Sequence, residues 1–212
     1  MSRTERTNLC DAALAAGPEA PTLCGEWNVK DLIVHLLVRE RDPLGAPGII
    51  VPQLEGLTAR ASRRMAGQSF PVLVEKVRQG PPRLSPLSLG VVDRMINTVE
   101  YFVHLEDIRR AQPDWTPREL SEREQKTLWK TISVTGKGMA RSAGVPLQIC
   151  WPGSAGGDDR TAVLRKGADP VVVSGTPSEI VLFLFGRKQV DDLSFTGPTE
   201  KIAQLRQADL GI

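Results

Sequence analysis

Residues 91–111 show the clearest separation of apolar from polar positions in the chain. Their apolar side chains recur at steps of three and four residues, the spacing of one buried helix face: Val92, Met95, Ile96, Val99, Phe102 and Val103. Beside this face runs a narrow polar strip, which consists of Asp93, Asn97, Glu100, His104 and Asp107. Beyond the strip the surface is apolar again, at Tyr101, Leu105 and Ile108. A polar strip between two apolar surfaces is typical of a helix that lines a wet pocket inside a bundle.

The same periodicity predicts further helices at residues 4–16, 29–41, 53–65, 71–79 and 118–141. The helix at 29–41 begins with Asn28 and Asp31 in the spacing of a capping box. It is apolar around most of its circumference, and its one polar gap holds Asn28, Asp31 and His35. This helix therefore repeats the pattern of residues 91–111: mostly buried, with a single narrow polar strip that carries a histidine.

After residue 144 the period changes from helical to β-like. Short runs typical of strands occur at residues 145–151, 161–166, 171–175 and 192–197, and short helices are predicted at 177–186 and 198–208. The sequence thus predicts an α+β protein with two domains. A helical, metal-binding domain is expected at residues 1–143 and a small α/β domain at residues 144–212.

The chain has only two histidines, His35 and His104, and each lies on a narrow polar strip of a largely apolar helix. Glu100 precedes His104 by four residues, about 40° around a helix axis, so both side chains can reach one point. Two imidazoles and one carboxylate are a common ligand set for a catalytic divalent metal ion, with a position left for water or substrate. Zinc suits these ligands best, while nickel, iron and manganese also accept them.

A purely structural interpretation of these residues remains open, because E-x-x-x-H arises by chance in many helices. In that case His104 is an ordinary helix residue, and His35 pairs with Asp31 one turn away. Alternatively, Asp31 and Asp107 accept hydrogen bonds from the two imidazoles and orient them as metal ligands.

Composition and charge restrict the class of protein. Lys and Arg number 27 and acidic residues 25, giving a net charge of +2. The densest basic group, Arg60, Arg63 and Arg64, has no interleaved aromatic residues, so a nucleic-acid surface is not expected. The chain starts without an apolar signal core, and its longest strongly apolar run, residues 180–185, is far too short to span a membrane. Three cysteines without a C-x-x-C spacing indicate reduced thiols and a cytoplasmic protein.

Three segments resemble a known family. TLCGEWNVKDLIVHLL (22–37) and NTVEYFVHLEDIRRA (97–111) together resemble the N-terminal metal-binding domain of the mycothiol-dependent maleylpyruvate isomerase family, part of the DinB-like superfamily of four-helix bundles. GTPSEIVLFLFGRKQVDDLSFTG (175–197) is similar to the small sterol-carrier-protein-like α/β domain that many of these proteins carry at the C-terminus. The resemblance implies a metal triad of His35, Glu100 and His104 that holds zinc or another divalent ion. It also implies mycothiol as co-substrate, and Arg187 as the arginine that assists a substrate carboxylate.

The resulting expectation is a metal-assisted enzyme, a transferase or an isomerase, that activates a low-molecular-weight thiol. The thiolate would either displace a leaving group or add reversibly to an unsaturated acid. Its partners are a small-molecule thiol and an electrophilic substrate, with no nucleic acid or membrane, and the oligomeric state is left open. Two alternatives stay open: a non-catalytic metal- or ligand-binding sensor that acts through a partner, and a hydrolase that uses metal-bound hydroxide.

Overall fold

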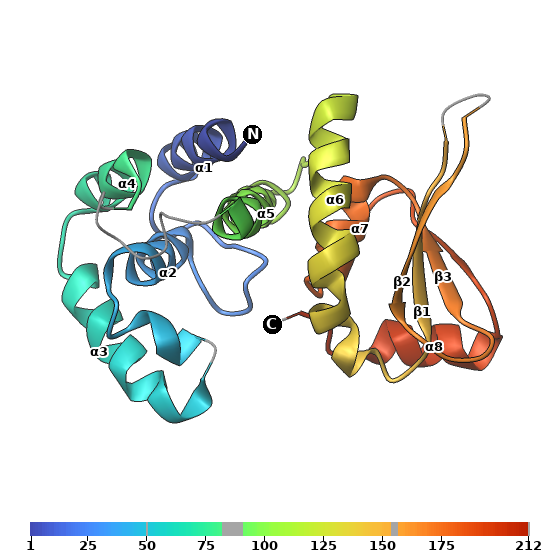
Figure 1. Cartoon of the computed structure of the whole chain (residues 1–212). Helices are drawn as coiled ribbons and strands as arrows, with labels where there is room; N and C mark the ends of the chain where they lie inside the picture. Colours follow the sequence, from blue (N-terminus) through green and yellow to red (C-terminus); the bar gives the residue numbers. More distant parts are fainter. Residues whose placement is uncertain (50, 82–90, 154–156, 212) are drawn as a thin grey trace. The chain divides into compact units, whose positions relative to one another are not determined.

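The protein is described by a computed structural model that covers residues 1–49, 51–81, 91–153 and 157–211, without the side chains of Pro52 and residues 91–96. The chain is a mixed α+β protein, as predicted, and it divides into two compact units, Met1–Thr116 and Pro117–Ile212 (Figure 1). The predicted apolar positions Val92, Met95 and Ile96, and the polar position Asp93, lie outside the described side chains.

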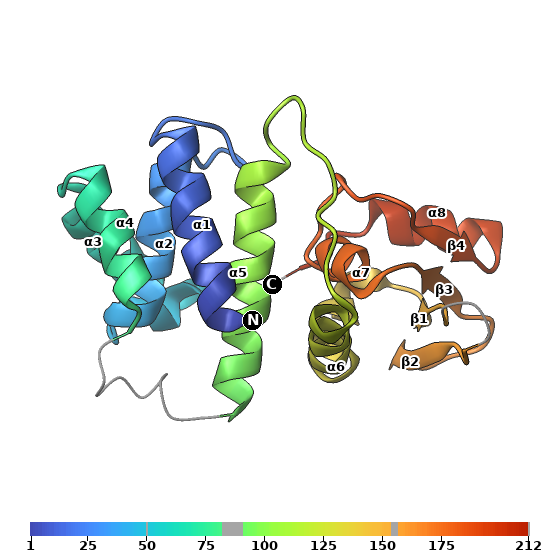
Figure 2. The same ribbon diagram turned by 90° about the horizontal axis from the view of Figure 1, so that it is seen from above.

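The first unit is helical in its described part. It contains α1 (Ser2–Ala16), α2 (Val29–Arg41), α3 (Glu55–Ala66), α4 (Phe70–Gln79) and α5 (Val91–Arg109), with 3-10 turns at Ala46–Ile49 and Pro52–Leu54. Helices α1, α2, α4 and α5 are seen nearly end-on in Figure 1 and lengthwise in Figure 2, where they lie side by side. The predicted capping box at Asn28 and Asp31 starts α2.

The core of the first unit explains why α2 and α5 show so little polar surface. Its largest fully buried aliphatic side chains come from α1, α2, α4 and α5 and include Leu9, Leu32, Ile33, Leu36, Leu37, Leu73, Leu105 and Ile108. Burying each such side chain contributes about 1.5–3 kcal/mol. On α5, Tyr101, Leu105 and Ile108 are as deeply buried as Val99, Phe102 and Val103. The predicted apolar surfaces on both sides of the polar strip are therefore confirmed for the described side chains.

The second unit combines a long helix with a sheet. Helix α6 (Glu122–Met139) and a 3-10 turn (Ala140–Ala143) precede β1 (Leu147–Trp151), β2 (Arg160–Arg165), β3 (Val171–Ser174), α7 (Pro177–Leu184), β4 (Ser194–Thr196) and α8 (Thr199–Gln207). The strand order is β2-β1-β3-β4, with β1 and β3 parallel and the other two pairs antiparallel.

The compact units divide at residues 116–117, whereas the change of periodicity places the boundary at residues 143–144. The reason is that α6 packs on the elements that follow it. A Cβ atom at Gly136 would lie 3.1 Å from the Leu164 side chain of β2, and Gln125 donates a hydrogen bond to Ser178 of α7 at 3.1 Å. The helix begins at Glu122 and not near residue 118 as expected, because Ser121 caps it and forms a capping box with Glu124.

Two further findings concern the whole described chain. No helix among the described residues is both long and apolar enough to cross a membrane. Cys10, Cys24 and Cys150 form no disulfide bond with one another.

A buried polar cluster joins α1, α2 and α5 away from the histidines. The Tyr101 hydroxyl donates a hydrogen bond to Glu40 Oε1, and Arg6 Nη2 donates to the Tyr101 oxygen at 2.5 Å. Glu40 is only 4% exposed, and its Oε2 has no hydrogen-bond partner among the described residues. Burial therefore raises the pKa of the Glu40 carboxyl, although Tyr101 and nearby arginines counteract part of this effect.

The Glu40 carboxyl is expected to make stability depend on pH. Because its folded-state pKa lies above the unfolded value, the stability that it contributes is present at low pH and is lost as pH rises through the folded pKa. Glu40→Gln removes this titration. The free energy of unfolding of the variant should therefore increase relative to that of the parent as the pH rises from about 4 to 8. Urea unfolding across this range measures the difference. Exposed Glu55→Gln is the control, and parallel profiles for parent and Glu40→Gln would contradict the prediction.

Candidate metal centre

The structure brings His35, Glu100 and His104 together. Helix α2 carries His35, and α5 carries Glu100 and His104 on consecutive turns. One potential ligand atom from each residue lies within 4.8 Å of those from the other two. His104 Nε2 is 3.6 Å from Glu100 Oε2, and the centroids of the two imidazole rings are 5.5 Å apart at an interplanar angle of 73°. The residues selected by the sequence pattern thus form one cluster.

The ring of His104 is oriented by Asp107, one turn further along α5. Its Nδ1 lies 3.0 Å from Asp107 Oδ2, and the Asp107 side chain is fully buried. With Nδ1 engaged in this way, Nε2 is the nitrogen that faces Glu100. A metal-binding histidine usually has a carboxylate on its outer nitrogen, the one that does not face the metal and here Nδ1. That carboxylate fixes the ring and increases the basicity of the inner nitrogen, here Nε2.

The loop between α1 and α2 covers both histidines. Cys24 Sγ lies 3.0 Å from Asp107 Oδ2 and 3.8 Å from His104 Nδ1, and the Trp27 ring lies 5.1 Å from that of His35. Thr22 holds the loop in shape: its hydroxyl donates to the Trp27 carbonyl at 2.7 Å and accepts from the Cys24 amide at 3.2 Å. The Leu23 amide donates to the Asp107 carbonyl, which fastens the loop to α5.

Cys24 is a residue of the cluster that sequence reasoning did not select. Its thiol, His104 and Asp107 form a second group whose ligand atoms lie within 4.8 Å of one another. The two groups share His104, which offers Nε2 on the Glu100 side and Nδ1 on the Asp107 side. No spacing in the sequence indicates Cys24, because it lies in an irregular loop.

Arg39 is the second residue that was missed. Its Nε lies 3.7 Å from Glu100 Oε2, and its Nη1 donates to Asn97 Oδ1 at 2.8 Å. Arg39 follows His35 by four residues, so both side chains lie on the same strip of α2. The spacing that paired Glu100 with His104 could have identified it.

The two histidines differ in their electrostatic surroundings. Burial, and then the neighbouring His104, lower the pKa of His35 to about 3. Burial alone would also lower the pKa of His104, but hydrogen bonds with Asp107, Cys24 and Glu100 outweigh it and raise that pKa well above its ordinary value. For Glu100, burial acts to raise the pKa, yet His104 and Arg39 outweigh it and bring it to about 2. At neutral pH the ion-free cluster therefore contains a neutral His35, a protonated His104 and an ionised Glu100.

The other predicted site residues lie elsewhere. Asp31 is exposed, and its carboxylate accepts a hydrogen bond from the Asn28 amide at 3.3 Å. It serves the capping box of α2 and not the His35 ring, so the expected support of His35 by Asp31 is not found. Arg187 lies in the second unit, where its Nη1 donates to the Phe185 carbonyl at 2.6 Å, and its role at a substrate carboxylate stays a prediction.

Comparison with protein-family models, curated proteins and solved structures finds no match to this chain. The case for the site therefore comes from its own geometry and chemistry.

The chain's two histidines allow a direct test of these electrostatics by NMR. In chelator-treated protein, we expect the imidazole signals of His35 to stay in the neutral form between about pH 5 and pH 8. Those of His104 should stay in the protonated form. Asp107→Asn preserves shape but removes the charge beside Nδ1, so it should lower the pKa of His104.

Asp31→Asn is the matched control, because Asp31 precedes His35 by one turn but its hydrogen bonds among the described residues are with Asn28 at the start of α2. It should leave both histidine titrations unchanged. If His35 instead titrated like a free histidine, or if Asp107→Asn left His104 unaffected, the described environment would be wrong.

Proposed function

We propose that this chain binds a divalent metal ion, with zinc the best fit, through His35, Glu100 and His104. We further propose that the protein activates a low-molecular-weight thiol, such as mycothiol, for S-transfer or isomerisation. The observation that carries the proposal is the convergence of the three ligand atoms within 4.8 Å of one another. The resemblance to the mycothiol-dependent maleylpyruvate isomerases and the DinB-like bundles supports it from the sequence.

The residues present fit such an ion. Zinc bonds of about 2.0–2.2 Å to nitrogen and oxygen in a tetrahedron place two ligand atoms roughly 3.3 Å apart. The distance of 3.6 Å between His104 Nε2 and Glu100 Oε2 needs only a small adjustment of side chains. His35 is neutral and Glu100 is ionised, which is the form in which each residue binds a metal. His104 alone must release a proton.

Each residue of the cluster then has a distinct task. Asp107 and Cys24 hold the outer nitrogen of His104, and Trp27 covers the ring of His35. Arg39 places a permanent positive charge 3.7 Å from Glu100, so it is suited to bind an anionic group of a substrate beside the metal ligands. When bound, a divalent ion with an open position lowers the pKa of a thiol or water and so supplies a nucleophile near neutral pH.

The proposal also includes a fold family for each unit and a role for Arg187. We assign the first unit to the DinB-like four-helix bundles and the second to the sterol-carrier-protein-like domains. Arg187 is then the residue of the second unit that would bind a substrate carboxylate. Its position directly after the apolar helix α7, in the segment FLFGR, supports this assignment.

Metal affinity should depend on all three ligands and on pH. We expect His35→Ala, Glu100→Gln and His104→Ala each to weaken Zn²⁺ binding by more than about 100-fold, and Asp107→Asn by about 10–100-fold. Because His104 is protonated without the ion, binding should release close to one proton per metal at about pH 7. Affinity should then rise by up to about tenfold per pH unit until the pKa of His104 is passed. Isothermal titration calorimetry in buffers of different ionisation enthalpy measures both quantities.

Glu100→Gln is nearly isosteric and therefore separates ligand loss from unfolding, which circular dichroism checks for every variant. Asp31→Asn is the control that should keep the parent affinity. Unchanged Zn²⁺ affinity in a folded Glu100→Gln or His104→Ala variant would exclude this site.

Activity should require both the metal and the thiol. We expect Zn²⁺-loaded protein with mycothiol to isomerise maleylpyruvate or to transfer the thiol to an electrophile such as monobromobimane. Glu100→Gln should lower turnover by at least about 100-fold because the ion is lost. Turnover that persists in Glu100→Gln would contradict the proposal.

The same assay separates the competing functions. Metal-dependent turnover of ester or amide substrates without any thiol would replace the proposal with a hydrolase. Tight metal binding without turnover across thiols and electrophiles would replace it with a non-catalytic sensor.

A further inference from the structure

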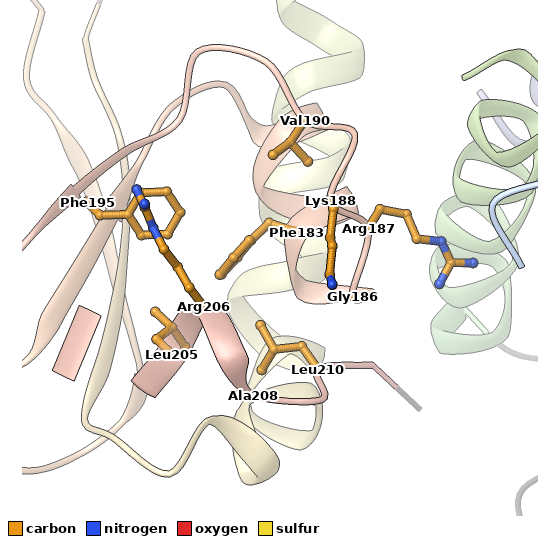
Figure 3. Close-up of a pocket in the computed structure, with 10 residues that line it drawn as sticks. All are labelled: Phe183, Gly186, Arg187, Lys188, Val190, Phe195, Leu205, Arg206, Ala208 and Leu210. Carbon is orange, nitrogen blue, oxygen red and sulfur yellow. The ribbon is translucent and has the colours of Figure 1, made fainter. Parts of the chain in front are cut away.

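The second unit contains a cavity of about 340 Å³ that neither the metal ligands nor their neighbours line. Its walls come from the end of α7, the segment after it, β4, α8 and the segment after α8 (Figure 3). The lining residues are Phe183, Gly186, Arg187, Lys188, Val190, Phe195, Leu205, Arg206, Ala208 and Leu210. A volume near 300 Å³ lies at the small end of ligand-binding pockets.

Most of the cavity wall is apolar. Phe183, Leu205 and Leu210 belong to the buried core of this unit, and the rings of Phe183 and Phe195 meet edge to face at 5.3 Å and 71°. An apolar body placed here would exchange water for aromatic and aliphatic surface. The cavity is thus suited to the apolar part of a small molecule.

The polar part of the wall is positively charged. Arg206 lies over Phe195, with its guanidinium carbon 4.7 Å from the ring centroid, and Figure 3 shows Lys188 on the other side of Phe183. Within the described chain, neither Lys188 nor Arg206 forms an ion pair, and no described carboxylate lines the cavity. Both side chains are exposed, and together they give the edge of the apolar hollow a positive charge, which favours an anionic ligand over a neutral one.

We propose that this cavity binds a small organic anion that consists of one aromatic ring or a short acyl chain and a carboxylate. The apolar part contacts Phe183, Leu205 and Leu210, and the positive charges of Lys188 and Arg206 at the edge of the hollow attract the carboxylate. The volume suits a molecule of this size better than a long chain or a large fused-ring system. This site lies within the second unit and does not depend on the proposed metal site.

Phenylacetate and its neutral amide, phenylacetamide, test the proposal on the full-length protein. Titrations of ¹⁵N-labelled protein by NMR, with a chelator present so that bound metal contributes nothing, report both affinity and location. For a ligand of this size we expect Kd on the order of 1 mM for the acid and at least about fivefold weaker binding of the amide. The shifted amides should cluster around Phe183, Gly186, Phe195 and Leu210.

Variants separate the contribution of the two positive charges to binding from that of the apolar hollow. Lys188→Gln and Arg206→Gln should each weaken phenylacetate binding by about three- to tenfold, without affecting the amide. Ala208→Phe should fill the hollow and abolish binding of both compounds. Lys166→Gln, an exposed lysine of the same unit outside the cavity, is the matched control and should bind like the parent.

Three results would overturn the proposal. These are no binding of phenylacetate at about ten times the expected Kd, equal affinity for acid and amide, and shifts that cluster away from the cavity. None of them bears on Zn²⁺ binding by the first unit, so this proposal and the metal proposal can fail separately.

Discussion

The imidazole of His104, held between the carboxylates of Glu100 and Asp107, is the interaction on which the candidate site depends. A buried charge is costly unless it is paired and hydrogen-bonded. Here one helix supplies all three groups, because residues 100, 104 and 107 follow one strip of α5. The arrangement therefore requires only that α5 forms and that its flanking surfaces are buried. Tyr101, Leu105 and Ile108 on one side, and Val99, Phe102 and Val103 on the other, provide this burial.

This local origin explains how much of the site the sequence could predict. Glu100, His104 and Asp107 follow from helical spacing alone, and His35 was the one histidine left to complete a ligand set. Cys24 and Trp27 could not be placed, because hydrogen bonds of Thr22 and Leu23 determine the path of their loop. The sequence offered two local partners for the Asp31 carboxylate, the start of its own helix and the His35 ring. In the structure it accepts a hydrogen bond from the Asn28 amide, as the capping box predicted, and periodicity alone could not decide between the two.

The fold was predictable to a similar extent. Apolar periodicity gave the helices and strands of the described chain to within a few residues, since each element carries its own pattern. The division into units depends instead on which surfaces meet. Helix α6 resembles the helices before it in sequence pattern, yet Gly136 allows close approach of Leu164 and Leu184, and Gln125 pairs with Ser178. Such pairings join residues far apart in the chain, and the period of a single helix contains no information about them.

The charges of the cluster also bear on the kind of ligand that would complete a metal site. In the ion-free protein, two carboxylates of Glu100 and Asp107 are offset by protonated His104 and by Arg39, while His35 is neutral. Exchange of one proton on His104 for a divalent cation would leave one surplus positive charge in a buried site. An anionic ligand such as a thiolate neutralises that charge, whereas a neutral thiol does not. The same balance that keeps His104 protonated without metal would thus favour the deprotonated form of a thiol once the metal is bound.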